Sequence, residues 1–207
     1  MAQYDEKYRS TASYWGHKPS NLCLAVLELL PPERPLRLID IGCGEGRNAV
    51  FFARNGYSVT AFDISSVGVA KTLRAAEEAG VAVNAFESDL HSFRLSEEYD
   101  IVFSTGTLHY VPQPLRVEVF DNYKRHTAPN GIHAFSVLVQ KPFISKAPDA
   151  QTSAHHFISG ELFTYYHDWR IELCNEAIFD YLSGGVPHQH AANRIIARNM
   201  HGATKLS

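Results

Sequence analysis

Residues 38–48 constrain the fold more than any other part of this chain, because a strand-like apolar run that contains an acid leads directly into closely spaced glycines. They read Leu-Ile-Asp-Ile-Gly-Cys-Gly-Glu-Gly-Arg-Asn, and a helix-forming run follows at once. A glycine turn between a strand and a helix is typical of the first crossover of a doubly wound sheet, where nucleotide-type ligands bind. Glycine lets the backbone pass close to such a ligand because it has no Cβ.

The spacing of these glycines narrows the class of ligand. A dinucleotide fingerprint requires its third glycine three residues after the second, and Arg47 occupies that position. The chain has no Gly-Lys-Ser/Thr of the Walker type. Asp40 disfavours a pyrophosphate, because two negative groups would face each other in a partly desolvated turn. A ligand with positive charge suits Asp40 better, and S-adenosylmethionine (SAM) carries an ammonium and a sulfonium.

Acids follow two later strand-like runs. Asp63 lies about 20 residues past the glycine turn, where an acid accepts hydrogen bonds from ribose hydroxyls. The alternative for Asp63 is a loop or helix-capping role, and the glycine turn upstream favours the ribose. Asp89 is placed to accept a hydrogen bond from an adenine amino group, with Leu90 packing nearby.

Composition excludes several classes of function. The chain has 207 residues, of which 45% are hydrophobic and 20% charged, and a net charge of −3. Without a basic run or a basic–aromatic stripe, we expect neither nucleic acid nor a membrane as partner. No apolar run approaches the roughly 20 residues of a membrane helix, and no signal-like segment begins the chain, which favours a cytoplasmic protein. We expect reduced thiols, with Cys23 and Cys174 in the core.

Strands and helices are expected to alternate. The expected elements are helix 19–30, strand 36–41, helix 46–55, strand 58–62, helix 66–79, strand 82–86, strand 99–104, helix 114–126 and strand 131–138. This alternation indicates βαβ units and a parallel sheet, with right-handed crossovers that place helices on both faces.

The last part of the chain differs from this pattern. A helix is expected near 159–166, and strands over 169–174 and 194–198, joined at Gly184-Gly185, indicate an antiparallel hairpin at the sheet edge. The predicted fold class is therefore α/β and Rossmann-like: a doubly wound, mostly parallel seven-stranded sheet with an antiparallel C-terminal hairpin, the class I methyltransferase fold.

We expect one domain, 1–207. The expected division is an N-terminal lid and helix (1–30), a SAM-binding core (36–138), and an acceptor-side segment with the edge hairpin (139–200). The size and the absence of a separate recognition domain favour a small-molecule acceptor, bound by a monomer or homodimer.

Several segments resemble a known family. Residues 40–48 are similar to the SAM-binding motif of class I methyltransferases. Residues 56–65 and 14–20 are similar to the tellurite-resistance (TehB-like) methyltransferases of that class, and residues 157–169 resemble the family's Phe-Lys-Glu-Gly-Glu-Leu segment and the tyrosine-rich helix after it. The resemblance runs from about residue 10 to residue 198.

The chain also departs from that family. Ile158-Ser159 replaces the family's Lys-Glu pair, so any role for charge there is lost. The family has a His followed by Arg near the last hairpin. His188 can take the His position, but Gln189 follows it and His190 comes next. Arg194 is a further candidate for a downstream Arg, although its spacing does not align cleanly.

The cofactor site follows from these motifs. The glycine turn with Asp40 is expected to hold the methionine end of SAM, Asp63 the ribose, and Tyr14-Trp15 to cover the site as a lid. Arg47 either reaches the pocket or forms a structural ion pair, and we favour the structural role. The expected cofactor residues are Tyr14, Trp15, Asp40, Gly42, Cys43, Gly44, Arg47, Asp63, Ile64, Asp89, Leu90, Ser104, Thr105 and Gly106.

Methyl transfer requires a nucleophile held about 3 Å from the methyl carbon, opposite the sulfur. His188 or His190 is expected to bind an oxyanion or accept a proton, with His109 as the next candidate. No metal is expected, because no acid or cysteine accompanies these histidines at a recognisable spacing. The sequence favours a SAM-dependent methyltransferase acting on a small-molecule acceptor, with tellurite, selenite and thiols as candidate acceptors. The alternative is a non-catalytic SAM-binding regulatory or sensing protein.

Overall fold

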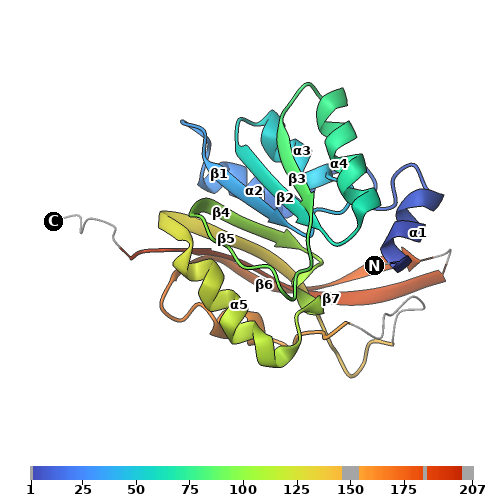
Figure 1. Ribbon diagram of the computed structural model, residues 1–207. Coiled ribbons are helices and arrows are strands. Elements are labelled where there is room, and N and C mark those ends of the chain that lie inside the picture. Colours follow the sequence, from blue (N-terminus) through green and yellow to red (C-terminus); the bar gives the residue numbers. More distant parts are fainter. Residues whose placement is uncertain (1, 146–153, 184–185, 202–207) are drawn as a thin grey trace.

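Seven strands form one sheet at the centre of the molecule (Figure 1). The structure is a computed structural model that describes residues 2–145, 154–183 and 186–201. The strands are β1 (Arg37–Ile41), β2 (Ser58–Asp63), β3 (Val83–Glu87), β4 (Tyr99–Thr105), β5 (Thr127–Val139), β6 (Arg170–Ser183) and β7 (Val186–Arg198). Their order is β3-β2-β1-β4-β5-β7-β6. Among the described strands, neighbours from β3 to β5 pair in parallel, and β7 pairs antiparallel with both β5 and β6. The predicted fold class is therefore confirmed.

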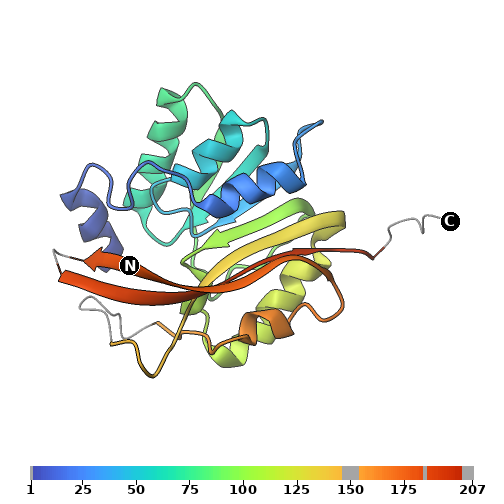
Figure 2. The same cartoon turned by 180° about the vertical axis from the view of Figure 1, so that it is seen from behind.

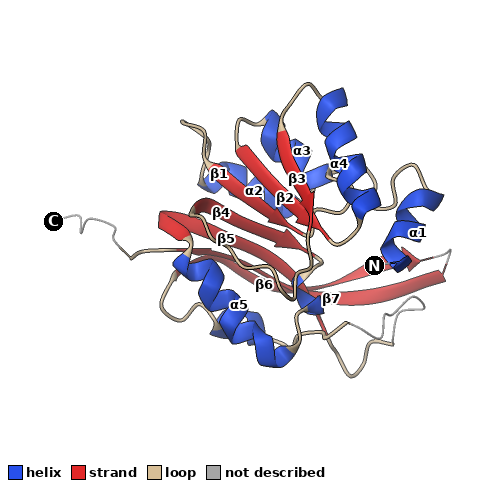
Figure 3. Ribbon diagram, in the orientation of Figure 1, coloured by secondary structure: helices blue, strands red, loops and turns tan. Residues whose placement is uncertain are grey.

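Helices cover both faces of this sheet (Figure 3). They are α1 (Ala2–Ser10), α2 (Asn21–Leu29), α3 (Arg47–Arg54), α4 (Ser66–Glu78), α5 (Gln113–Arg125) and α6 (Glu161–Thr164), with a short 3-10 turn, η1 (Leu108–Tyr110). Residues of α2, α3 and α4 pack on one face, and residues of α5 and α6 on the other. Strands β1 and β4 are buried on both faces, which explains why they read as nearly continuous apolar runs in the sequence.

The C-terminal hairpin is much longer than the sequence pattern predicts. Strands β6 and β7 pair from Arg170 opposite Arg198 to Ser183 opposite Val186, and the hairpin extends well past the other strands (Figure 2). Gly184 and Gly185, expected at the turn, lie outside the described residues. The extra length carries mixed polar and apolar side chains, so its sequence gives a weak strand signal, and pairing between β6 and β7 extends along it. Cys174, expected in the core, is exposed because β6 is the edge strand.

Two helices also differ from the sequence-based expectation. The helix expected over 159–166 spans only Glu161–Thr164. The sequence of α1 is polar and has no apolar periodicity that would predict a helix. Contacts with the rest of the protein hold this helix in place. Its Tyr8 is buried, and Asp5 Oδ1 accepts a 2.5 Å hydrogen bond from Ser65 Oγ at the start of α4. Among the described helices, none is long and apolar enough to cross a membrane.

Candidate active site

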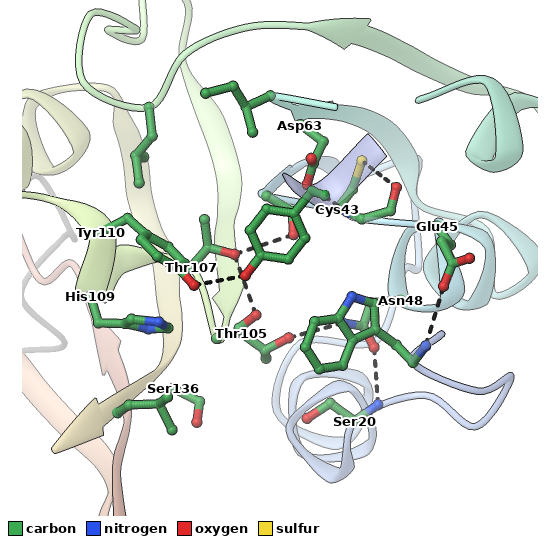
Figure 4. Close-up of a pocket in the computed structure, with 18 of the residues that line it drawn as sticks. Ser20, Cys43, Glu45, Asn48, Asp63, Thr105, Thr107, His109, Tyr110 and Ser136 are labelled. Carbon is green, nitrogen blue, oxygen red and sulfur yellow. Dashed lines mark hydrogen bonds between the residues drawn. The ribbon is translucent and has the colours of Figure 1, made fainter. Parts of the chain in front are cut away.

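A cavity of about 620 Å³ opens at the carboxyl ends of β1, β2 and β4. This is the edge at which doubly wound sheets bind their ligands, and the volume is in the range of small-molecule sites. Figure 4 shows two sides of this cavity: His109, Tyr110 and Ser136 on one, and Ser20, Glu45 and Asn48 on the other. We call the wall formed by the loops after β1, β2 and β3 the cofactor half, and the wall formed by residues 105–110 and strands β5 to β7 the acceptor half.

The glycine turn after β1 is held against the end of β2. The backbone N–H groups of Gly42 and Cys43 both donate to the carbonyl oxygen of Phe62, at 2.9 Å each. Gly42 has a φ of 73°, and a Cβ at this position would overlap the side chain of Thr107. Only glycine suits both the left-handed backbone and this close approach.

Asp63 links the first two loops of the cofactor half. Its Oδ2 accepts a hydrogen bond from the Gly44 N–H and its Oδ1 accepts one from the Ser65 N–H, both at 2.9 Å. Burial raises the pKa of Asp63, and these two hydrogen bonds oppose that rise. A carboxylate has about four acceptor positions, so Asp63 retains capacity for ribose hydroxyls on the cavity side.

Asp40 lies beneath the cavity wall and not on it. Its side chain is 1% exposed, and its Oδ2 has no hydrogen-bond partner among the described residues. Burial, with a further contribution from the negative charge of Asp63, raises the pKa of Asp40 to about 7. A buried acceptor without a partner is costly, and a proton or a nearby ligand cation relieves that cost. The chemistry of this position therefore fits the ammonium of SAM.

The N-terminal segment is clamped over the cofactor half by two residues that flank Gly46. Glu45 Oε2 accepts hydrogen bonds from the N–H groups of Tyr14 (2.7 Å) and Trp15 (3.2 Å). Arg47 Nη1 donates to the Trp15 carbonyl oxygen at 2.8 Å. Trp15 lines the cavity and Tyr14 does not. Arg47 both lines the cavity and holds the segment, but through a backbone carbonyl and not through the ion pair that the sequence suggested.

Sequence reasoning missed two parts of this lid. Glu45 stands inside the glycine motif, where its side chain had no predicted partner, although the structure bonds it to the lid and to Lys71 Nζ at 2.8 Å. Helix α1 contributes Tyr4 and Tyr8 to the cavity wall. The Tyr8 hydroxyl accepts a 3.0 Å hydrogen bond from Trp15 Nε1, which joins α1 to the lid.

Of the remaining cofactor candidates, Asp89 and Thr105 lie on the cavity wall and Ser104 lies behind it. Asp89 is exposed on the wall, where its Oδ1 accepts a 2.9 Å hydrogen bond from the His91 N–H. Thr105 also lines the cavity, and its Oγ1 accepts a 3.1 Å hydrogen bond from Asn48 Nδ2. Ser104 is buried, and its Oγ donates to the Ile41 carbonyl oxygen at 2.9 Å, which ties β4 to β1 and leaves the side chain off the wall.

Three histidines meet in the acceptor half. His109 is 3% exposed, and its Nδ1 has no hydrogen-bond partner among the described residues. Burial, and then the neighbouring His156 and His190, lower the pKa of His109 to about 3, so this imidazole is neutral at physiological pH. The rings of His109 and His156 are 5.5 Å apart. His188 is not on the wall, but its Nε2 lies 3.0 Å from Nε2 of His190.

The cavity therefore collects most of the residues singled out in the sequence, and four lie off its wall. On the wall are Trp15, Gly42, Cys43, Gly44, Arg47, Asp63, Ile64, Asp89, Leu90, Thr105, Gly106, His109 and His190. Off the wall are Tyr14, Asp40, Ser104 and His188. No group of three or more His, Cys, Asp or Glu side chains in the described part of the chain is arranged to hold a metal ion.

Comparison with known proteins identifies the family. A family model described as "Tellurite resistance protein TehB" matches residues 3–198. The chain belongs to the TehB family. It is 26% identical to the "Probable S-adenosyl-L-methionine-dependent methyltransferase TehB" of Haemophilus influenzae over 173 residues, which cover 84% of this chain and 56% of that protein. It is 29% identical to "Hemagglutinin 1" of Eikenella corrodens over 154 residues, 74% of this chain and 50% of that protein.

The fold agrees with this family. The crystal structure of TehB from Haemophilus influenzae matches with a TM-score of 0.77 and 22% sequence identity, over 95% of this chain and 65% of that one. The two proteins therefore share a fold. The chain spans about half the length of the curated relatives that it matches.

Proposed function

We propose that this TehB-family protein is a SAM-dependent methyltransferase that acts on a small acceptor. The supporting observation is the division of charge within the cavity. The acids on the cavity wall, Glu45, Asp63 and Asp89, all lie in the cofactor half, with Asp40 beneath it and with Lys7 and Arg47 beside them. The described part of the acceptor half has Arg194 and three histidines on its wall and no acid. A cationic methyl donor is attracted to the first half and an anionic acceptor to the second. The name of the Haemophilus relative supports the same cofactor.

The residues of the cofactor half suit each part of SAM. The backbone of the glycine turn would hold the methionine end, with the charge of Asp40 beneath it, Asp63 would hold the ribose and Asp89 the adenine edge. When bound, SAM supplies an activated methyl group on a sulfonium. The lid residues Trp15 and Tyr8 would cover the bound cofactor and exclude water, and the acceptor half would orient the nucleophile toward the methyl group.

The imidazole chemistry supports an acceptor that ionises easily. A general base works best when its pKa lies near the operating pH, and the pKa of His109 is about 3. His109 is therefore poorly suited to remove a proton from a neutral alcohol. An acceptor that already carries negative charge, such as tellurite, selenite or a thiolate, needs no such base.

Two measurements test this proposal. Isothermal titration calorimetry should show that S-adenosylhomocysteine (SAH) binds and NAD does not. Incubation with methyl-labelled SAM should then give labelled product with tellurite, selenite or a thiol, and less with a phenol. Binding of SAH without product from any acceptor would contradict catalysis and support the regulatory or sensing alternative.

A further inference from the structure

The floor of the acceptor half is one face of the C-terminal hairpin and of the strand beside it. His190, Ala192 and Arg194 alternate along β7, so their side chains share one face, and all three line the cavity. Phe179 of β6 stands opposite His190, and Ser136 of β5 stands opposite Arg194. We call this strip the acceptor groove; its residues are Ser136, Leu138, Phe179, His190, Ala192 and Arg194.

The acceptor groove is longer than a small oxyanion. Arg194 follows His190 by four positions, which corresponds to about 14 Å of extended strand. Its chemistry changes along that length. Arg194 and Ser136 are polar at one end, Leu138 and Ala192 are apolar in the middle, and at the other end the rings of Phe179 and His190 lie 5.8 Å apart. A tellurite or selenite ion would contact only one end of this groove.

Arg194 stands out among the arginines near the sheet because its guanidinium has no hydrogen bond or ion pair with any described residue. Arg198, four residues later on the same strand, pairs with Glu172 at 2.6 Å, and the buried Arg116 pairs with Glu161 at 2.6 Å. Arg194 is half-buried on the cavity wall, and no acidic residue lines the described part of the acceptor groove. A guanidinium in this setting is suited to bind a carboxylate through two parallel hydrogen bonds.

The opposite end of the groove favours a flat apolar group. The His190 ring contacts both Phe179 and Tyr181, the latter at 5.5 Å between centroids, and these rings form an aromatic wall above the hairpin. The small Ala192 leaves room on the floor between that wall and Arg194. Aromatic rings prefer such edge-to-face and offset contacts.

We propose that the acceptor groove binds an aromatic carboxylate that carries a soft nucleophile such as a thiolate. The carboxylate pairs with Arg194, and the ring lies over Ala192 and Leu138 against the Phe179–His190 wall. The thiol proton leaves to solvent before transfer. The thiolate lone pair then forms the new S–CH3 bond as the bond from that methyl to the sulfonium sulfur of SAM breaks, which leaves the thioether and neutral SAH. This inference rests on the proposed methyltransferase function and names its acceptor class.

The test is a set of calorimetric titrations into SAH-saturated protein. The probes are 4-mercaptobenzoate, thiophenol, which lacks the carboxylate, and mercaptoacetate, which lacks the ring. We expect 4-mercaptobenzoate to bind at least tenfold more tightly than either of the others. Arg194→Gln should weaken 4-mercaptobenzoate at least tenfold and leave thiophenol unchanged. Phe179→Ala should weaken both aromatic probes and spare mercaptoacetate. Arg74→Gln, at an exposed position on α4, is the matched control and should change nothing.

The outcomes separate this inference from the proposed function. If SAH binds but 4-mercaptobenzoate binds no better than mercaptoacetate, the assignment of the acceptor groove is wrong and the methyltransferase proposal stands. The assignment is also wrong if Arg194→Gln weakens both aromatic probes equally, or if it weakens SAH itself, since Arg194 would then serve the cofactor. Failure of SAH to bind wild-type protein would overturn the proposed function and the acceptor groove with it.

Discussion

We predict that Asp40 makes cofactor binding depend on pH, because its carboxyl is buried next to the cofactor half. In the ligand-free protein, burial and the charge of Asp63 raise the pKa of Asp40 to about 7. A ligand ammonium beside this carboxyl favours its ionised form and therefore lowers that pKa on binding. The carboxylate is the competent form, so SAH affinity should be constant above about pH 7 and should fall as the pH decreases below it.

The magnitude follows from linkage. Each pH unit below the pKa of the ligand-free protein requires one more tenfold depletion of the ionised form, which is about 1.4 kcal/mol per unit. From pH 8 to pH 5.5, with a pKa of about 7, SAH affinity should fall roughly 30-fold. Below pH 7, binding should also release close to one proton per site.

The assay is calorimetric titration of SAH from pH 5.5 to 8 in pairs of buffers that differ in ionisation enthalpy, which counts the protons released. Asp40→Asn should bind SAH weakly and should show a much shallower pH profile, with only the contribution of Asp63 remaining. Asp121→Asn, at an exposed position on α5, is the matched control and should keep the wild-type profile. A flat wild-type profile, or an unaltered profile in Asp40→Asn, would refute this account of Asp40.

Three other substitutions test separate parts of the site. Asp63→Ala should weaken SAH binding by about 1–3 kcal/mol, since it removes a ligand acceptor and the bond to the glycine turn; unchanged calorimetric affinity would show that the ribose binds elsewhere. Glu45→Gln should weaken the hydrogen bonds that hold Tyr14 and Trp15 and speed SAH dissociation several-fold, as measured by stopped-flow fluorescence of Trp15. An unchanged dissociation rate would exclude a clamping role for Glu45. Arg116→Met should lower the free energy of unfolding in urea by about 3 kcal/mol, because it removes the ion-pair partner of the largely buried Glu161, which keeps only its hydrogen bonds with Ile158 and Tyr165. A loss below about 1 kcal/mol would contradict that.

The cofactor half could be predicted from the sequence because its determinants are local. The glycine turn, Asp63 and Asp89 each follow a strand at a fixed point, and parallel strands bring those points together at one edge. Asp40 is the instructive exception. Sequence reasoning placed it at the ligand, but the alternation of β1 directs its side chain beneath the wall.

The acceptor half could not be predicted in the same way. Its residues come from β5, β6 and β7, and only the register of the hairpin brings Phe179 opposite His190 and Arg194 opposite Ser136. The sequence pointed to His188, His190 and His109, of which His188 lies off the cavity wall and the other two line it. Helix α1 was missed for a related reason: its polar sequence gives little signal, and its position depends on tertiary contacts such as the burial of Tyr8.

The hairpin that forms the acceptor groove is joined to the parallel core along a single strand boundary, β5 with β7. Alternation along β7 means that one inward side chain can be exchanged without altering its neighbours in the hydrogen-bonded ladder. If the proposed function holds, acceptor preference can therefore change by point substitution in the hairpin while the loops of the cofactor half stay intact. For a designer, the same separation makes β6 and β7 the natural place to introduce a new ligand preference while the loops of the cofactor half stay unchanged.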